Sequence, residues 1–295
     1  MKLFESIESV KTYVQEQKGR KKIGLVPTMG ALHRGHKALL EASVRDNDVT
    51  ICSIYINPTQ FNDKADLKKY PRTLEKDLKL LEAVGCDAVF CPSDQIMYES
   101  VEHQILKLDF GYLSRALEGQ YRPGHFSGVG LVVAKLFNIV EPHRAYFGQK
   151  DLQQLAVIRQ LVQELLVPVE IKSVPIVRTE EGLALSSRNQ RLSKEEKELA
   201  TQLYTALSLA KQLYSSGVTA AAASKQAVQQ LGHYPDIRLE YLEAVDPLSF
   251  RLVEEIDQLQ AVAFCLAAYV GEVRLIDNII VGKNLQEEHL TSSNR

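Results

Sequence analysis

The sequence lacks several features that would assign a chain of this length to a particular class. Its four cysteines form no CxxC pair and have no histidine at zinc-finger spacing, which argues against a structural zinc site. The formal net charge is −2, so no overall electrostatic attraction to nucleic acid or acidic membranes exists. No apolar run approaches the length of about 20 residues that a membrane-spanning helix needs, and the N-terminus MKLFESIESV is too acidic for a signal peptide. We therefore expect a cytoplasmic protein with reduced thiols that binds neither membrane nor nucleic acid.

Short apolar or β-branched runs alternate with helical patterns over the first 176 residues. The runs predict strands, because turn residues bound them and they are too short for helices. Strands that alternate with helices form parallel sheets, so we predict an α/β fold with a doubly wound, Rossmann-like nucleotide-binding sheet. We also expect one amphipathic helix over residues 2–18 and a loop over the glycine-rich residues 119–130. The predicted strands lie at residues 23–26, 49–56, 87–91, 144–148 and 169–174.

The composition changes after about Val177, where a second, smaller domain is predicted. Two helical patterns are followed by three strand-like runs, the last two of which flank Gly271 as a hairpin would. We predict a nucleotide-binding domain at 1–176, an α+β lid domain at 177–283 and a polar, frayed tail at 284–295. The helical patterns lie within 194–231 and the strand-like runs at 237–245, 261–270 and 273–281.

Residues 26–36, VPTMGALHRGH, place a turn with two histidines between a predicted strand and a predicted helix. Free backbone N–H groups at a helix N-terminus attract phosphate, and His33 and His36 can add side-chain donors. Open α/β sheets bind ligands at the carboxyl ends of their strands, where this turn is expected to lie. An accidental surface pair and a metal site are the alternatives, although no third metal ligand is evident nearby.

Two further polar segments suit a nucleotide. In FGQKD, at residues 147–151, Lys150 can contact phosphate and Asp151 a ribose hydroxyl or a metal-bound water, with Gln154 one turn farther on. The same two residues could instead form an ordinary solvated helix start. In LSSRN, at residues 185–189, two hydroxyls and a guanidinium offer phosphate donors of fixed geometry, although such loops also occur without a function.

The tetrapeptide HRGH at 33–36 resembles the HxGH signature of the class I adenylyl-transfer superfamily. Seven blocks in order along the chain extend the likeness to one family, that of the pantothenate synthetases. They are VPTMGALHRGH (26–36), IYINPTQFN (54–62), YPRT (70–73), LEGQYRPGHFSGV (117–129), YFGQKDLQQ (146–154), LALSSRN (183–189) and RLIDNI (274–279).

This resemblance implies ATP-dependent ligation of pantoate and β-alanine through pantoyl adenylate, with release of AMP and pyrophosphate. It also implies a homodimer that forms through the N-terminal domain. Mg²⁺ is expected to accompany ATP and to keep several waters, so no protein metal ligand is assigned. Asp77 is a candidate for an outer-sphere contact to that ion.

By the same resemblance, His36 is the expected proton donor and His33 lies beside it on the phosphates. Catalytic roles fall on His33, His36, Lys150, Ser186, Ser187 and Arg188. The ATP site comprises Met29, Gly30, Ala31, Leu32, His33, Arg34, Gly35, His36, Gly148, Gln149, Lys150, Asp151, Val177, Leu185, Ser186, Ser187 and Arg188. Pantoate and β-alanine are assigned to Gln60, Gln154, Asn57, Tyr70 and Arg122.

Two departures from related patterns bear on the assignment. Gln149 stands where many relatives carry glutamate, which affects no assigned role. The loop at 186–189 is SSRN rather than a lysine-rich KMSKS loop, which argues against a tRNA ligase. Two alternatives remain: an adenylyl transferase with a phosphorylated acceptor, and a non-catalytic nucleotide sensor. The first would need cations where Gln60 and Gln154 stand.

Overall fold

The computed structural model describes residues 1–98, 106–254 and 261–282, and the predicted tail at 284–295 lies outside them. The chain divides into two compact units. The first consists of Met1–Gln149 and Gln154–Val177, and the second of Lys150–Gln153 and the described residues from Arg178 onward. The short segment Lys150–Gln153 therefore belongs to a different unit from its neighbours on either side.

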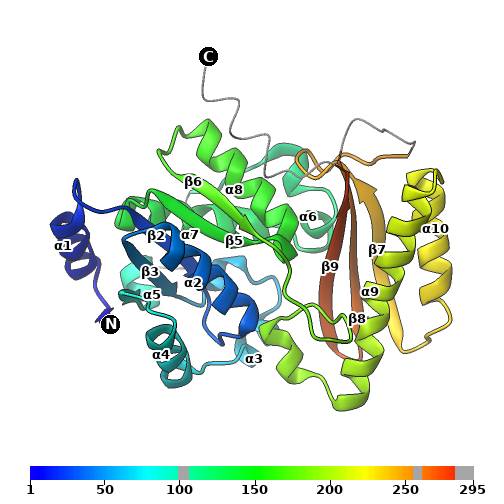
Figure 1. Ribbon diagram of the computed structural model, residues 1–295, viewed down its shortest axis with the longest axis horizontal. Helices are drawn as coiled ribbons and strands as arrows, with labels where there is room; N and C mark the ends of the chain where they lie inside the picture. Colours follow the sequence, from blue (N-terminus) through cyan, green and yellow to red (C-terminus); the bar gives the residue numbers. More distant parts are fainter. Residues whose placement is uncertain (99–105, 255–260, 283–295) are drawn as a thin grey trace. The chain divides into compact units, whose positions relative to one another are not determined.

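The first unit is built on a six-stranded parallel sheet in the order β1-β4-β3-β2-β5-β6 (Figure 1). The strand order reverses between β2 and β5, which is the switch point where doubly wound sheets bind ligands at the carboxyl ends of their strands. The Rossmann-like prediction is thus confirmed. The strands are β1 (Lys2–Phe4), β2 (Ile23–Thr28), β3 (Val49–Ile54), β4 (Ala88–Phe90), β5 (Arg144–Gly148) and β6 (Glu170–Val174).

Helices cover both faces of this sheet (Figure 1). Helix α2 packs on one face against β2, β3 and β5, and α7 packs on the other against β2. Leu40 of α2 and Val26 of β2 are fully buried in the core between them. The helices are α1 (Ile7–Gln17), α2 (Arg34–Asp46), α3 (Lys64–Lys69), α4 (Leu74–Ala83), α5 (Asp94–Met97), α6 (Glu118–Tyr121), α7 (His125–Val140) and α8 (Leu152–Glu164), with short 3₁₀ turns η1 (Pro58–Gln60), η2 (Gly111–Ser114) and η3 (Gln149–Asp151).

The prediction of a helix over residues 2–18 was wrong for its first residues. Lys2–Phe4 forms strand β1, which pairs in parallel with β4, and the helix begins only at Ile7. Ser6 caps this helix by accepting the N–H of Ser9 at 3.2 Å. The strand depends on a sheet edge supplied by residues 88–90, which lie far along the chain, so local periodicity could not reveal it.

The predicted loop at 119–130 was also wrong in part, because α7 begins at His125 and includes Gly128. A Cβ atom on Gly128 would lie 2.4 Å from the carbonyl oxygen of Thr59. Such a contact is too short, so this glycine allows the backbone of η1 to lie directly against α7. Glycine is needed here because α7 and η1 approach each other closely, and not because the backbone adopts a loop conformation.

The second unit has a three-stranded antiparallel sheet, β7 (Ile237–Val245), β8 (Val262–Val270) and β9 (Val273–Val281). The strands β8 and β9 form the predicted hairpin at Gly271, where φ is 55°. Alanines such as Ala206 and Ala223 are fully buried where α9 (Lys194–Ser215) and α10 (Ala220–Leu231) pack together over the sheet. The turn η4 (Ser187–Arg191) precedes α9. The α+β prediction for this part of the chain is confirmed.

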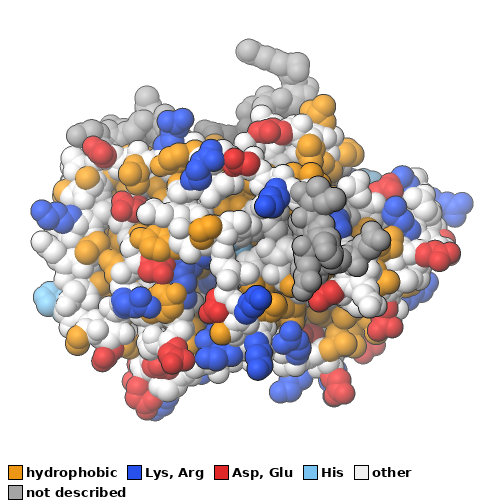
Figure 2. Space-filling view, turned by 180° about the vertical axis from the view of Figure 1, so that it is seen from behind, with side chains coloured by type: hydrophobic (Ala, Val, Ile, Leu, Met, Phe, Trp, Pro, Cys, Tyr) orange, Lys and Arg blue, Asp and Glu red, His pale blue; other side chains and the backbone are white. Residues whose placement is uncertain are grey.

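No helix in the part of the chain that the structure describes is long and apolar enough to cross a membrane. On the face shown in Figure 2, lysine and arginine side chains are interspersed with aspartate and glutamate. This mixture agrees with the near-neutral net charge of the chain.

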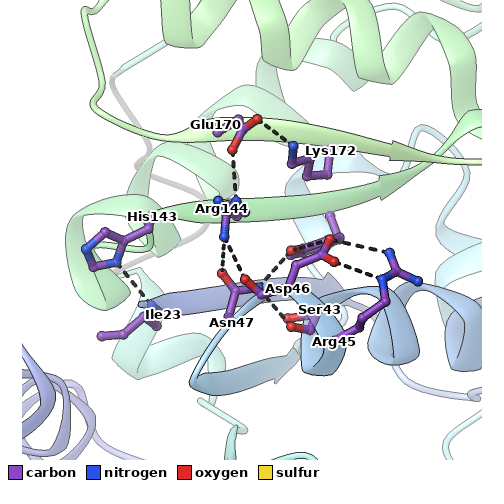
Figure 3. A network of polar contacts seen from close by, with 10 residues as sticks. Ile23, Ser43, Arg45, Asp46, Asn47, His143, Arg144, Glu170 and Lys172 are labelled. Carbon is purple, nitrogen blue, oxygen red and sulfur yellow. Dashed lines mark hydrogen bonds and ion pairs between the residues drawn. The ribbon is translucent and has the colours of Figure 1, made fainter. Parts of the chain in front are cut away.

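A polar network joins the amino ends of β2, β5 and β6 to the end of α2 (Figure 3). Arg144 donates to the Glu170 carboxylate at 2.9 Å and to the carbonyl of Asp46 at 2.6 Å. Asn47 donates to the hydroxyl of Tyr146 at 2.7 Å. Burial raises the pKa of Tyr146 to about 12, so this hydroxyl stays protonated and can donate to Asp46 at 3.2 Å.

We predict that Arg144→Ala lowers the free energy of unfolding by about 1–3 kcal/mol, because the carbonyl of Asp46 loses a charged donor. Urea denaturation followed by circular dichroism measures the change. Lys172→Ala is the matched control: it breaks only the exposed pair with Glu170 and should cost less than about 1 kcal/mol. Equal effects of the two substitutions would contradict the prediction.

Candidate active site

The turn after β2 runs through two successive left-handed residues. Gly30 has a φ of 77° and Ala31 a φ of 50°. A glycine adopts this conformation freely, whereas Ala31 carries a Cβ and is strained there. Something outside the turn must therefore hold it.

Asp77 of α4 holds the turn. Its carboxylate accepts the N–H of Ala31 at 2.9 Å and the N–H of Leu32 at 2.8 Å, and Thr73 donates to it at 3.1 Å. The side chain of Asp77 is buried, at 3% exposure. Charged acceptors give the stronger hydrogen bonds, so this contact compensates for the strained backbone.

Both histidines use Nδ1 to cap the start of α2. His33 accepts the N–H of Gly35 at 3.1 Å, and His36 accepts the N–H of His33 at 3.3 Å, in a reciprocal capping box. An imidazole nitrogen that accepts a hydrogen bond carries no proton, so each neutral ring is protonated at Nε2. Each ring is thus held as an Nε2–H donor, and the ring centres lie 4.1 Å apart.

This geometry bears on one part of the sequence argument. Phosphate binding is predicted to use backbone N–H groups of this turn, and those of Ala31, Leu32, His33 and Gly35 are hydrogen-bonded to Asp77 and the two imidazoles. The Nε2–H groups of His33 and His36 add side-chain donors to the same turn.

A buried amide pair lies at η1. Asn57 is 1% exposed, and its Oδ1 accepts from the Tyr98 hydroxyl at 2.9 Å and the Thr59 hydroxyl at 2.9 Å. Its Nδ2 then donates to Gln60 Oε1 at 3.1 Å and to the carbonyl of Gly128 at 3.1 Å. With its oxygen held by Asn57, Gln60 presents Nε2 to Met29 Sδ at 3.1 Å. A thioether is a weak acceptor, so a substrate oxygen would be a better partner for Nε2.

The main chain of Gln60 is fixed from α6 and α7. His125 Nδ1 donates to its carbonyl at 2.8 Å, and Arg122 donates to it at 3.4 Å. Arg122 also pairs with the buried Glu118 at 3.5 Å. Tyr70, the residue that ends α3, is buried. Its ring packs edge-on against the ring of Phe61.

The structure therefore brings Met29, Asn57, Gln60 and Arg122 together in the first unit. Gly148, Gln149, Gln154 and Val177 belong to this unit as well, and Gln154 is half-buried in α8. The sequence argument missed Tyr98, His125 and Glu118. His125 and Glu118 stand inside the quoted block at 117–129 and could have been considered, whereas nothing in the sequence marked Tyr98.

The other predicted ATP residues belong to the second unit, namely Lys150, Asp151, Leu185, Ser186, Ser187 and Arg188. Ser186 caps η4 by accepting the N–H of Arg188 at 3.2 Å, and Ser187 is buried. Lys150 lies half-buried in η3, where Asn278 donates to its carbonyl at 3.0 Å.

The chain was compared with known proteins. A family model described as pantoate-beta-alanine ligase matches residues 2–280. The chain belongs to the pantoate–β-alanine ligase family. A pantothenate synthetase of Cytophaga hutchinsonii is 46% identical over 278 residues, which are 94% of this chain and 98% of that protein. One of Thermotoga petrophila is 46% identical over 290 residues, which are 96% of this chain and 100% of that protein.

Solved structures of pantoate–β-alanine ligases agree with this fold. The pantothenate synthetase of Thermus thermophilus superposes with a TM-score of 0.89 at 40% identity, over 96% of this chain and 100% of that one. The pantoate-beta-alanine ligase of Francisella tularensis, described as complexed with Beta-gamma ATP and Beta-alanine, gives a TM-score of 0.78 at 33% identity. That superposition covers 95% of this chain and 97% of the other.

We predict that Asp77→Asn lowers the free energy of unfolding by about 1–3 kcal/mol, because an amide nitrogen would face a buried N–H donor. The affinity for ATP, measured by calorimetry, should also fall, since the histidine turn is no longer held. Glu75→Gln, which neutralises an exposed acid in the first turn of the same helix, is the control and should change neither quantity. Unchanged stability in Asp77→Asn would show that the carboxylate does not hold the turn.

Proposed function

We propose that the protein catalyses the ATP-dependent ligation of pantoate and β-alanine, through pantoyl adenylate, with release of AMP and pyrophosphate. One contact carries the proposal: Gln60 Nε2 lies 3.1 Å from Met29, in the same turn that carries His33 and His36. An oriented amide donor for a carboxylate and two imidazole donors for phosphate therefore stand on adjacent segments. Family membership and the Francisella relative described with Beta-gamma ATP and Beta-alanine support the same reaction.

In the first step, an oxygen of the pantoate carboxylate attacks the α-phosphorus of ATP. The bond between that phosphorus and the bridging oxygen to the β-phosphate breaks, and pyrophosphate leaves. Gln60 and Gln154 orient pantoate, with Asn57, Tyr70 and Arg122 around the acid and amine sites. The Nε2–H groups of His33 and His36 are assigned to the departing charge as hydrogen-bond donors. Because Nδ1 of His36 accepts the N–H of His33, the neutral His36 ring donates a hydrogen bond to the leaving group and keeps its proton. Donors that are fixed before the reaction stabilise developing charge at no cost in reorganisation.

In the second step, the amine of β-alanine attacks the carbonyl carbon of the mixed anhydride. The carbon–oxygen bond to AMP breaks and AMP leaves, an amide bond forms, and the proton that the attacking nitrogen sheds passes to water. A free carboxylate is a poor acyl donor, so adenylation supplies the leaving group, and the protein mainly positions the reactants. Lys150, Ser186, Ser187 and Arg188 are assigned to the phosphates, where cations and hydroxyls of fixed direction offset negative charge.

Mg²⁺ would enter with ATP and supply charge neutralisation at the phosphates. Asp77 does not fit a direct ligand, because it is buried and both its oxygens already accept N–H groups. Among the described residues, no three histidine, cysteine, aspartate or glutamate side chains gather as a metal site would require. Mg²⁺ keeps several waters in nucleotide sites, so we expect phosphate oxygens and waters to hold the ion.

The setting is also part of this proposal. None of the four cysteines forms a disulfide and three of them are buried, which fits the reducing, cytoplasmic environment that we propose. The proposed oligomer is a homodimer, which light scattering would measure directly. The lid role of the C-terminal domain stays a prediction.

Pyrophosphate exchange tests the reaction. Labelled pyrophosphate should enter ATP only when pantoate is present, because exchange reports reversal of adenylation. Exchange driven by a phosphorylated acceptor, and indifferent to pantoate, would favour a different adenylyl transferase. ATP binding without AMP formation from ATP, pantoate and β-alanine would indicate a sensor.

We predict that His36→Ala slows pantoate-dependent exchange by about 10²–10³-fold, since it removes the Nε2–H donor. His36→Gln should slow it as well, because the amide N–H of a glutamine whose oxygen caps His33 does not occupy the position of the imidazole N–H. Only His36→Ala should also lose about 1 kcal/mol of stability, because glutamine at this helix position can still accept the N–H of His33. Thermal unfolding separates the two effects. A glutamine variant with a near wild-type rate would leave His36 with a capping role alone.

For Gln60→Glu we predict a rise of at least about tenfold in the KM for pantoate, with little change in the KM for ATP. The substitution replaces the Nε2 donor by an anionic oxygen that repels the pantoate carboxylate. Gln120→Glu, which adds the same charge at an exposed position, should leave both constants unchanged. Parallel increases in both constants for Gln60→Glu would indicate a distorted fold.

A further inference from the structure

Two buried polar side chains interrupt strand β9. Asp277 is 5% exposed and Asn278 is 2% exposed, and both lie within the RLIDNI block at 274–279. Neither side chain takes part in the reaction steps above. Buried polar groups are nearly always hydrogen-bonded, so the partners of these two residues indicate their task.

Asp277 forms a buried ion pair with Arg178. The two Arg178 nitrogens lie 2.5 Å and 2.8 Å from the two carboxylate oxygens, which is the bidentate arrangement. The Arg178 guanidinium also stacks 3.9 Å above the ring of Tyr204 and donates to the carbonyl of Asn278 at 3.2 Å. The main chain of Asn278 is therefore held from one side by Arg178, and its own N–H donates to Asp277 at 2.7 Å.

The same arginine organises the segment that leads to the serine loop. Arg178 donates to the carbonyl of Gly182 at 3.1 Å, and residues Arg178 and Ala184 face each other in an isolated antiparallel bridge. Asn189 donates to the carbonyl of Ala184 at 3.2 Å. The start of the segment that contains Ser186 and Ser187 is thus fixed to the ion pair.

Asn278 reaches the other phosphate candidate of this unit. Its Nδ2 donates to the carbonyl of Lys150 at 3.0 Å. Lys150 is the middle residue of η3, and one three-residue turn has little stability of its own. Burial raises the pKa of the Asp277 carboxyl, and Arg178, the N–H of Asn278 and, least of all, the charge of Lys150 oppose that rise.

We propose that Asn278, held in place by the Arg178–Asp277 pair, is a positioning residue that fixes the main chain at Lys150 and thereby aims its ammonium at the ATP phosphates. This inference rests on the proposed function, because it assigns Lys150 to phosphate. The RLIDNI block would thus contribute to ATP binding without contacting a substrate itself.

Asn278→Asp tests the inference, because it replaces the Nδ2 donor by an oxygen at nearly constant volume. We expect the KM for ATP to rise about tenfold or kcat to fall by a similar factor, while the KM values for pantoate and β-alanine stay within about twofold. Asn138→Asp, which changes an exposed asparagine that also donates to a carbonyl, controls for the added charge and should behave as wild type. Asn278→Ser removes the donor without a charge and replaces the aspartate variant if that one does not fold.

A double-mutant cycle with Lys150→Ala separates positioning from general structure. If Asn278 acts through Lys150, its substitution should change the ATP constants by less than about twofold in the Lys150→Ala background. Full additivity, or an equal rise in all three KM values, would overturn the positioning role. Wild-type constants in Lys150→Ala itself would instead refute the assignment of Lys150 to phosphate, so the two failures are distinguishable.

Discussion

One carboxylate determines the geometry of the histidine turn. Asp77 binds the N–H groups of Ala31 and Leu32 at 2.9 Å and 2.8 Å, and so stabilises an alanine at a φ of 50°. A left-handed residue with a Cβ costs about 1–2 kcal/mol, which two charge-assisted hydrogen bonds can offset. Because the turn is held there, α2 begins with His33 and His36 as its caps. Their tautomers, and hence the donors that we assign to phosphate, follow from the position of this single buried acid.

The amide of Gln60 is likewise oriented by hydrogen bonds to buried residues. Its direction is set by Asn57, whose own direction is set by Tyr98 and by the carbonyl of Gly128. The carbonyl of Gly128 lies within reach because a glycine allows α7 to touch η1. The assignment of the histidines to phosphate and that of Gln60 to pantoate therefore each depend on neighbouring buried residues as well. The amide of Gln60 and the two imidazoles, which we assign to the substrates, are each held through hydrogen bonds to buried groups.

Prediction from the sequence succeeded where the signal was local. The strands β5, β7 and β9 were predicted with the observed bounds, because each is a short apolar run between turn residues. Strand β1 was not, since it exists only by pairing with β4. The residues assigned to the site were found through the family resemblance, but the contacts of Asp77, Tyr98 and Asn278 join segments far apart in the chain. Spacing carries no information about such contacts.

The network around Arg144 (Figure 3) lies at the amino ends of β2, β5 and β6. The histidine turn, in contrast, follows the carboxyl end of β2. The network that stabilises the sheet and the turn that carries the two histidines therefore lie at opposite ends of the strands. A substitution at the amino edge is therefore expected to change the stability of the sheet while leaving in place the residues that we assign to the nucleotide.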